Sequence, residues 1–299
     1  MSYIPDDRKL VLINIPGTHD SAAYCMNCIG AHFSTTQYLS IKQQLEIGVR
    51  KFDFRITSID RNKEQNEDII CCHGICDCYV SYNHCDQRKL TYKSILLDIK
   101  NFLKKNPSET VMVSTFLGRG HFKNIIRAYE ILDYEVGDIA IYYDPNILLG
   151  ECRGRIIITT YLDNEVDKKR IKKVTTRSKS MINGTGIDEI HKKYNKNCKT
   201  YEIDGTLKIT EINDFLIEYN MTLEQAEIEQ KKNQSLFPIT YSISCTGENE
   251  YVIPYPLGQA FIVNSYIKDK FRKGYYYGWL NIDFVNLEIA SKLIASNFK

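Results

Sequence analysis

The sequence predicts an α/β fold, namely a single, irregular (β/α) barrel of the TIM type. Short apolar runs alternate with amphipathic segments along most of the chain, which is typical of parallel strands joined by helices. The 299 residues are close to the roughly 250 that such barrels commonly use. No linker-like stretch interrupts the alternation, so we expect one domain over residues 1–299 rather than two.

The expected strands are apolar runs that end at turn or charged residues. They cover Leu10–Ile15, Val49–Ile56, Asp68–Cys72, Thr110–Phe116, Arg155–Tyr161, Ile239–Cys245 and Gly278–Phe284.

Helices are expected where apolar residues recur every three or four positions. They cover Leu39–Ile47, Ser94–Lys105, the regions around Asn124–Leu132 and Thr222–Lys232, and Leu287–Ile294. Gly48 stands where a helix usually ends in a left-handed residue, and Pro107 stops the second helix. Residues 163–235 otherwise show little pattern beyond a basic run at 168–179.

The composition excludes several classes of protein. A net charge of +2 gives no global field for binding nucleic acid. No uninterrupted apolar run reaches the roughly 18 residues of a transmembrane helix. The segment Met1–Asp7 lacks the basic and apolar regions of a signal peptide, which predicts a cytoplasmic protein.

Cysteines crowd into one short stretch of the chain. Five of the ten lie within fifteen residues, together with two histidines: Cys71, Cys72, Cys76, Cys78, Cys85, His73 and His84. Their spacings match the usual zinc-binding pairs poorly. Disulfides would imply an oxidising compartment. Reduced thiols are therefore expected, with a disulfide or a zinc site as the alternatives.

Ionisable side chains stand at or near the ends of four expected strands, where barrel enzymes place their catalytic groups. The candidates are His19, Asp20, Asp53, Arg55, His73 and Asp283. Because side chains alternate along a strand, Asp53 and Arg55 share one face and Phe52 and Phe54 the other. Two charges on a buried face are costly unless they are paired or functional.

This set of side chains suits phosphodiester cleavage. One histidine can take a proton from an attacking hydroxyl, while the other protonates the leaving oxygen. An arginine stabilises charge on the phosphoryl oxygens, and a carboxylate fixes the tautomer of the base. The pattern requires no metal.

The chain resembles the X-domain family of phosphatidylinositol-specific phospholipases C. The resemblance is strong from about residue 10 to 120 and patchy beyond. It rests on Ile15–Ser21, Thr36–Gln37, Gln43–Arg55 and His73–Gly74, and further on Phe102–Thr110, Arg153–Ile157 and Gly278–Phe284.

The resemblance implies a role for each candidate residue. His19 would be the general base toward the inositol 2-hydroxyl, and His73 the general acid toward the diacylglycerol oxygen. Arg55 would contact the phosphate, and Asp283 would orient His19. Asp20 would assist at the leaving group. Asp53 is expected to bind substrate or hold Arg55.

The resemblance also implies the products and the partner. The products would be diacylglycerol and a cyclic inositol phosphate. Arg55 stands where calcium-dependent relatives bind the ion with carboxylates, so no calcium, other metal or cofactor is expected. The partner would be an inositol phospholipid, reached by a monomer that associates peripherally with a membrane surface.

Two places depart from the family pattern. The bacterial enzymes carry basic residues early after strand four and at the end of strand five. Here those places read Ser114–Leu117 and Ile158–Tyr161, without charge. The head group is therefore left open, and a phosphodiesterase for another head group is one alternative.

Aromatic side chains at Tyr275–Trp279 and Ile253–Leu257 are candidates for contact with the bilayer, and the basic run could attract anionic lipid. Three rival functions stay open. They are a catalytically silent inositol-phospholipid-binding module, a metal-dependent glycerophosphodiesterase-like barrel and a zinc-binding protein. The single Asp beside a cation argues against the metal-dependent barrel.

Overall fold

The computed structural model describes residues 1–59, 69–81, 88–120, 123–144, 146–159, 201–202, 221–233, 240–243 and 256–299. Its main sheet runs in the order β6-β7-β5-β2-β1-β10-β9-β8, and every pairing along this path is parallel. The strands are β1 (Ile15–Thr18), β2 (Lys51–Ser58), β5 (Val111–Leu117), β6 (Ala140–Tyr142), β7 (Ile156–Ile158), β8 (Tyr201–Glu202), β9 (Thr240–Ile243) and β10 (Trp279–Ile282).

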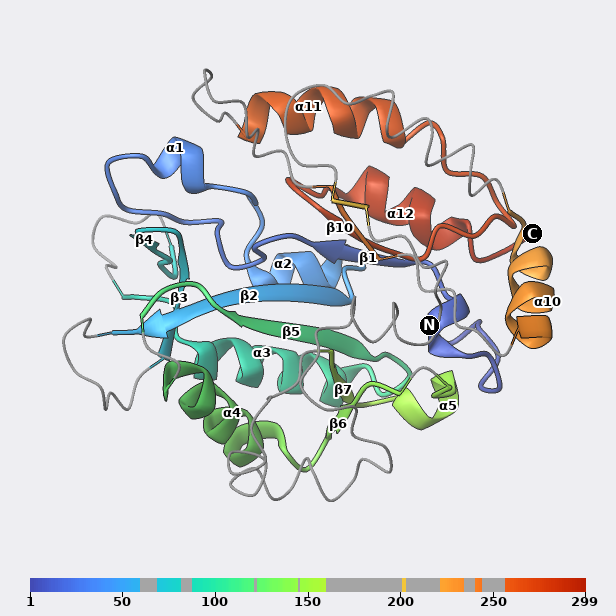
Figure 1. The fold of residues 1–299 in the computed structure, drawn as a ribbon, viewed down its shortest axis with the longest axis horizontal. Helices are drawn as coiled ribbons and strands as arrows, with labels where there is room; N and C mark the ends of the chain where they lie inside the picture. Colours follow the sequence, from blue (N-terminus) through green and yellow to red (C-terminus); the bar gives the residue numbers. More distant parts are fainter. Residues whose placement is uncertain are drawn as a thin grey trace.

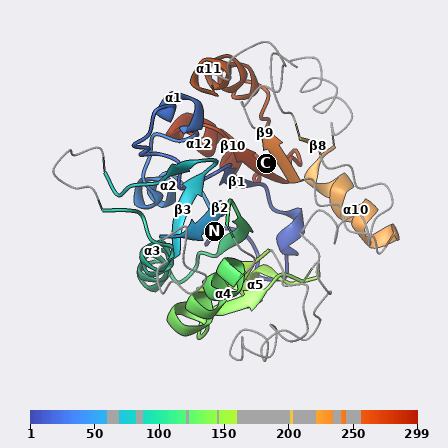
Figure 2. The ribbon, with the colours of Figure 1, turned by 60° about the vertical axis from the view of Figure 1, so that its left-hand side comes forward.

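Helices cover the outside of this curved sheet, as Figure 2 shows for α3, α4, α11 and α12. The helices are α1 (Ala31–Ser34), α2 (Ile41–Glu46), α3 (Tyr92–Lys105), α4 (Lys123–Val136), α5 (Leu149–Cys152), α10 (Leu223–Asn233), α11 (Pro256–Ile267) and α12 (Leu287–Ala295). Within the described ranges, the sheet does not close between its ends β6 and β8, so the barrel is irregular. No helix of the described residues is long and apolar enough to cross a membrane.

Side chains alternate between the barrel interior and the helical layer. Trp279 of β10 packs with Ile15, Met112 and Ile157 in one buried cluster inside the barrel. Its neighbour Leu280 belongs to the other cluster, which lies between the strands and the helices. This period of two is the normal consequence of extended backbone. It directs alternate residues of β1, β2 and β10 toward the barrel axis.

The N-terminal apolar run differs from its prediction. Leu10–Leu12 forms a 3-10 helix, η1, and β1 begins only at Ile15. The amide of Leu10 donates to the carbonyl oxygen of Ile147, and its side chain packs inside the barrel. A short apolar run fits a buried turn as well as a buried strand, so the pattern could not separate the two.

The third predicted strand also differs, in its direction. β3 (Ile69–His73) runs antiparallel to β2 and forms a hairpin with β4 (Cys76–Asp77), outside the main path. Only the ten residues 59–68 connect β3 to β2, and a parallel pair needs a longer crossover connection. β2 is also longer than its neighbour β1. It pairs with β1 only at Lys51 and Phe52, which leaves its end, from Ile56 to Ser58, open to β3.

The hairpin lies at the end of the molecule toward which β2 points. Figure 1 shows α1, β3 and β4 on the left, and α10 with both chain ends on the right. Chemistry at the carboxyl ends of the strands therefore lies beside the hairpin and α1.

Candidate active site

His19 directly follows β1 and faces the barrel axis. Gly17 two residues earlier lies in a tightly packed place, because a Cβ there would lie 3.0 Å from the carbonyl oxygen of Leu280 and 2.5 Å from Oδ1 of Asn281. The side-chain amide of Gln37 donates to the carbonyl oxygens of His19 and Ile282, at 2.9 and 3.0 Å. These bonds join the ends of β1 and β10, so His19 and the residue after Ile282 come together.

That residue is Asp283, which is fully buried and fixes the His19 ring. Its Oδ1 lies 3.0 Å from His19 Nδ1, and its backbone carbonyl accepts a bond from the Asn264 amide at 2.9 Å. A carboxylate only accepts, so Nδ1 carries the hydrogen and Nε2 faces the site. This is the geometry of an oriented base.

The pKa of His19 reflects both burial and charge. Burial alone lowers it, but the carboxylates of Asp20, Asp283 and Asp53 outweigh burial and raise the pKa to about 10. Folding therefore favours the protonated ring. The resulting stabilisation of the folded state is complete at pH values below 6.5, the ordinary pKa of histidine. It is lost as the pH rises through the pKa of His19 in the folded protein.

Arg55 reaches the same space from β2. Its Nε lies 3.1 Å from Asp20 Oδ1, and its Nη2 lies 3.4 Å from Asp53 Oδ2. The guanidinium carbon is 5.0 Å from the ring centre of Phe116 on β5, a cation–π distance. Two carboxylates and an aromatic face thus hold one cation, as the alternation along β2 predicts for Asp53 and Arg55.

Asp20 lies between His19, His73 and Arg55. Its Oδ2 is 3.5 Å from Nε2 of His19 and 3.1 Å from Nε2 of His73, while Oδ1 faces Arg55. Burial alone would raise the pKa of Asp20, but His19, His73 and Arg55 outweigh it and lower the pKa. Asp20 is therefore an ionised carboxylate at neutral pH.

His73 is held by two acceptors at once. Its Nδ1 lies 2.8 Å from the carbonyl oxygen of Ser34, and its Nε2 lies 3.1 Å from Asp20. A carbonyl and an ionised carboxylate both accept, so hydrogens on both ring nitrogens satisfy the arrangement. That form is the imidazolium, which can act as an acid.

All six predicted site residues thus come together at one end of the barrel. Ser34 was not predicted, because a backbone carbonyl leaves no trace in the sequence. Phe116 and Asn264 were missed as well, since an aromatic at a strand end and an amide in an apolar helix suggest ordinary packing. At the two places that depart from the family pattern, the hydroxyls of Ser114 and Thr159 bond to each other.

A metal site fits this geometry poorly. His19, Asp20 and Asp53 form a group close enough to share an ion. Both carboxylates, however, already contact the guanidinium of Arg55, which would repel a cation placed among them.

The cysteine-rich stretch holds a disulfide. Cys76 is bonded to Cys28, which contradicts the expectation of reduced thiols for this residue. Cys71 and Cys78 are free and buried, as expected, and Cys72 is buried as well. In the described ranges no cysteine belongs to a metal-binding group, while Cys85 and His84 lie outside them.

Three of the four aromatic side chains at 275–279 that were candidates for contact with the bilayer are not accessible to it. Tyr276, Tyr277 and Trp279 are buried, because they lead into and form β10, while Tyr275 is half-buried. Residues 253–255 and the basic run at 168–179 lie outside the described residues.

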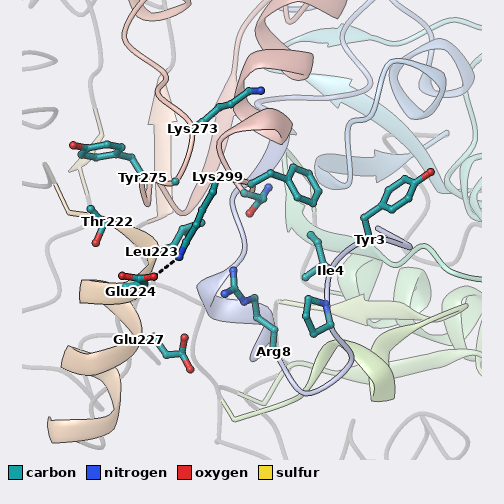
Figure 3. A pocket seen from close by; sticks show the side chains of 14 residues that line it. Tyr3, Ile4, Arg8, Thr222, Leu223, Glu224, Glu227, Lys273, Tyr275 and Lys299 are labelled. Atoms are coloured by element: carbon teal, nitrogen blue, oxygen red, sulfur yellow. Dashed lines mark hydrogen bonds and ion pairs between the residues drawn. The ribbon is translucent and has the colours of Figure 1, made fainter.

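A cavity of about 680 Å³ lies between both chain ends and α10, away from the site (Figure 3). Its acidic and basic side chains are mixed, and Lys299 pairs with Glu224. It contains none of the predicted site residues.

Known proteins share this fold and part of this sequence. Residues 6–132 match the domain family described as PI-PLC X 1. The 1-phosphatidylinositol phosphodiesterase of Listeria monocytogenes is 31% identical over 116 residues, which cover 38% of this chain and 31% of that enzyme. The match thus spans about a third of the length of this curated relative.

Solved structures extend the likeness to nearly the whole chain. The phosphatidylinositol-specific phospholipase C from Listeria monocytogenes matches with a TM-score of 0.63 and 20% identity, covering 99% of this chain and 97% of that one. A Staphylococcus aureus phosphatidylinositol-specific phospholipase C, studied for its membrane binding, matches with a TM-score of 0.66 and 20% identity over 99% and 96% of the two chains. These likenesses confirm the predicted irregular barrel.

Proposed function

Because residues 6–132 belong to the PI-PLC X family, we propose that the protein cleaves the phosphodiester of phosphatidylinositol-type lipids by histidine acid–base catalysis. One observation carries the proposal: His19, His73 and Arg55 converge on the carboxylate of Asp20. A phosphodiester placed there would meet a base, an acid and a fixed cation together.

The reaction begins with proton transfer to His19. In its neutral form, Nε2 takes the proton of the inositol 2-hydroxyl, and that oxygen attacks phosphorus. Arg55 stabilises the charge that grows on the phosphoryl oxygens. His73 then gives a proton to the diacylglycerol oxygen as its bond to phosphorus breaks. The products are diacylglycerol and a cyclic inositol phosphate.

The carboxylates serve these three groups. Asp283 holds the His19 ring and stabilises its charged form. Asp53 holds Arg55, and Asp20 assists proton donation by His73. Arg55 supplies the positive charge that calcium would otherwise supply, so the reaction needs no metal or cofactor.

The direct test is an assay on phosphatidylinositol vesicles with and without EDTA. We expect diacylglycerol and a cyclic phosphate, identified by phosphorus NMR, at the same rate in both samples. Loss of activity with EDTA, restored by calcium, would contradict the role of Arg55. Absence of cleavage in both samples would contradict the proposed function and favour the silent binding module.

The paired hydroxyls of Ser114 and Thr159 favour a second candidate. Ser114 lies on β5 and Thr159 directly follows β7, and neither side chain brings a positive charge to the site. The substrate could therefore carry a different head group. Glycan-linked and phosphorylated inositol lipids assayed beside phosphatidylinositol would identify it.

We expect Asp283→Asn to shift the pH dependence. In the free protein kcat/KM rises with pH as His19 loses its proton. Because the pKa of His19 is raised, this acidic limb of the pH profile lies above pH 6.5. Removing the Asp283 charge lowers that pKa, which moves the limb to lower pH. The maximum should fall roughly 10²-fold as the ring loses its orientation.

A pH–rate profile of kcat/KM on a soluble substrate measures this shift. Asp269→Asn, an exposed carboxylate changed in the same way, serves as the control and should keep the wild-type limb. An acidic limb unmoved in Asp283→Asn would show that His19 is not the base.

Exposed apolar side chains around the end of the barrel that holds the site support contact with a bilayer. Ile29 and Ile75 are exposed on the loop before α1 and on the turn of the β3–β4 hairpin, and Phe33 is exposed on α1. Phe261 is 74% exposed on α11, which packs beside α1. We propose that this rim places the monomer peripherally on the membrane, and its cytoplasmic location stays a prediction.

Phe261→Ser should weaken partitioning onto phosphatidylinositol-containing vesicles about tenfold, from the loss of one buried aromatic side chain. Co-sedimentation with the vesicles measures it. Tyr134→Ser is the matched control, because Tyr134 is 77% exposed on α4. Equal weakening by both variants would contradict a docking surface at the rim.

A further inference from the structure

His73 lies on a hairpin rather than on a strand of the barrel path, so its position depends on what holds the hairpin. β4 has two residues, and β3 pairs with β2 over three positions only. On one side Arg119 clamps the turn, through a 2.8 Å bond to the carbonyl of Gly74 and an ion pair with Asp77. The other side faces the loop that contains Ser34.

That loop supplies the acceptor for Nδ1 of His73. After Ser34 it is anchored in the core, because the amides of buried Thr36 and Gln37 donate to the carbonyl oxygen of Ala23. Toward the hairpin, Ser34 ends α1, a four-residue helix that has no buried residue and no side-chain cap at its N-terminus. Backbone bonds tie the start of the loop to the hairpin, from Tyr79 to the carbonyl of Cys25. Nearer to Ser34, the covalent link is the disulfide between Cys28 and Cys76.

The disulfide joins the two parts that must meet. Cys76 is the β-bridge partner of His73, and the Ser34 hydroxyl donates to Cys76 Sγ at 3.5 Å. One bond thus ties the strand opposite His73 to the loop that carries the acceptor of its Nδ1. Resting on the proposed function, we propose that the Cys28–Cys76 disulfide is a positioning element for His73 and that its reduction by a dithiol slows cleavage.

The chemistry is thiol–disulfide exchange. A thiolate of the dithiol attacks Sγ of Cys28, which is partly exposed, and Sγ of buried Cys76 leaves and takes a proton. The second thiol of the reductant then displaces Cys28, so one reductant disulfide and two protein thiols form. Burial raises the pKa of Cys71 and Cys78, which keeps these neighbours protonated and out of the exchange.

The test compares wild type with Cys28→Ser, each before and after treatment with dithiothreitol, in the full chain. Alkylation of free thiols followed by mass spectrometry measures the fraction of protein in which the Cys28–Cys76 disulfide is intact. We expect reduction to lower kcat of wild type about 10- to 100-fold with little change in KM, since misplacing a catalytic group acts on the chemical step. Cys28→Ser should match reduced wild type and ignore the reductant, and reoxidation of wild type should restore kcat.

NMR of 15N-histidine-labelled protein gives a second readout, because it reports the protonation of each ring nitrogen of His73 without substrate. We expect the Nδ1–H signal of His73 to be lost on reduction, while that of His19 persists. Cys152→Ser, a buried free cysteine on α5, should keep the full response to the reductant.

Three outcomes would overturn the inference: no bridge in the oxidised protein, a Cys28→Ser variant with the kcat and His73 signals of oxidised wild type, or a reductant effect that persists in Cys28→Ser. If oxidised wild type cleaves no phosphatidylinositol, the proposed function fails, while the His73 signals still decide the inference.

Discussion

Replacing His19 by alanine is expected to lower kcat/KM for phosphatidylinositol about 10³-fold, within the usual range for removal of a general acid or base. The variant removes the only group that faces the site with an oriented, strongly basic nitrogen among the described residues. Steady-state kinetics on a monomeric, short-chain substrate measure the loss without interference from membrane binding. Circular dichroism checks the fold.

Two comparisons identify the role of His19. His32→Ala removes an exposed histidine of α1 and should leave kcat/KM unchanged. A substrate with a nitrophenol leaving group needs no general acid, so it should restore much of the rate of His73→Ala and little of that of His19→Ala. Full activity of His19→Ala, or equal rescue of both variants, would contradict the assignment of base and acid.

Arg55→Lys is expected to lower kcat about 10²- to 10³-fold, the range seen when one preorganised electrostatic contact is lost. Lysine keeps the charge. With its single ammonium nitrogen, it cannot contact Asp20 and Asp53 from two nitrogens and also stack on Phe116, as the planar guanidinium of Arg55 does. The loss should therefore fall on kcat more than on KM.

Arg127→Lys provides the matched control, because Arg127 is a partly exposed arginine of α4 that pairs with Glu130. It should behave as wild type. If Arg55→Lys retained wild-type kcat, the guanidinium geometry would have no part in the reaction. Calcium added to Arg55→Lys tests in addition whether the ion can replace the lost contact.

The sequence predicted the parts of the fold that repeat a period. The amphipathic pattern of residues 94–105 matches α3, and alternation along β2 correctly placed Asp53 and Arg55 on one face. α11 was missed because it is apolar on nearly all sides and so has no helical period to detect. β6 was missed because three residues carry too little pattern.

Features that depend on distant partners could not be predicted. The pairing of β3 with β2 depends on the end of β2 that extends beyond its contacts with β1. The disulfide joins residues 48 positions apart, and only the fold shows that Cys28 lies beside Cys76. The burial of Trp279 likewise depends on the end of the barrel at which it lies. The site residues were predictable because each follows or lies within a recognisable strand, while their catalytic roles stay predictions.

Asp20 gives the resting protein an internal counter-ion. Protonated His19 and Arg55 would repel each other if their charges faced the same few ångströms of space alone, and His73 faces the same carboxylate. With the carboxylate among them, these three side chains are assembled when the chain folds, before any lipid arrives. An arriving phosphodiester therefore does not build the site. The phosphodiester replaces the Asp20 carboxylate in some of its contacts with these side chains, so Asp20 must lose those contacts when the substrate binds.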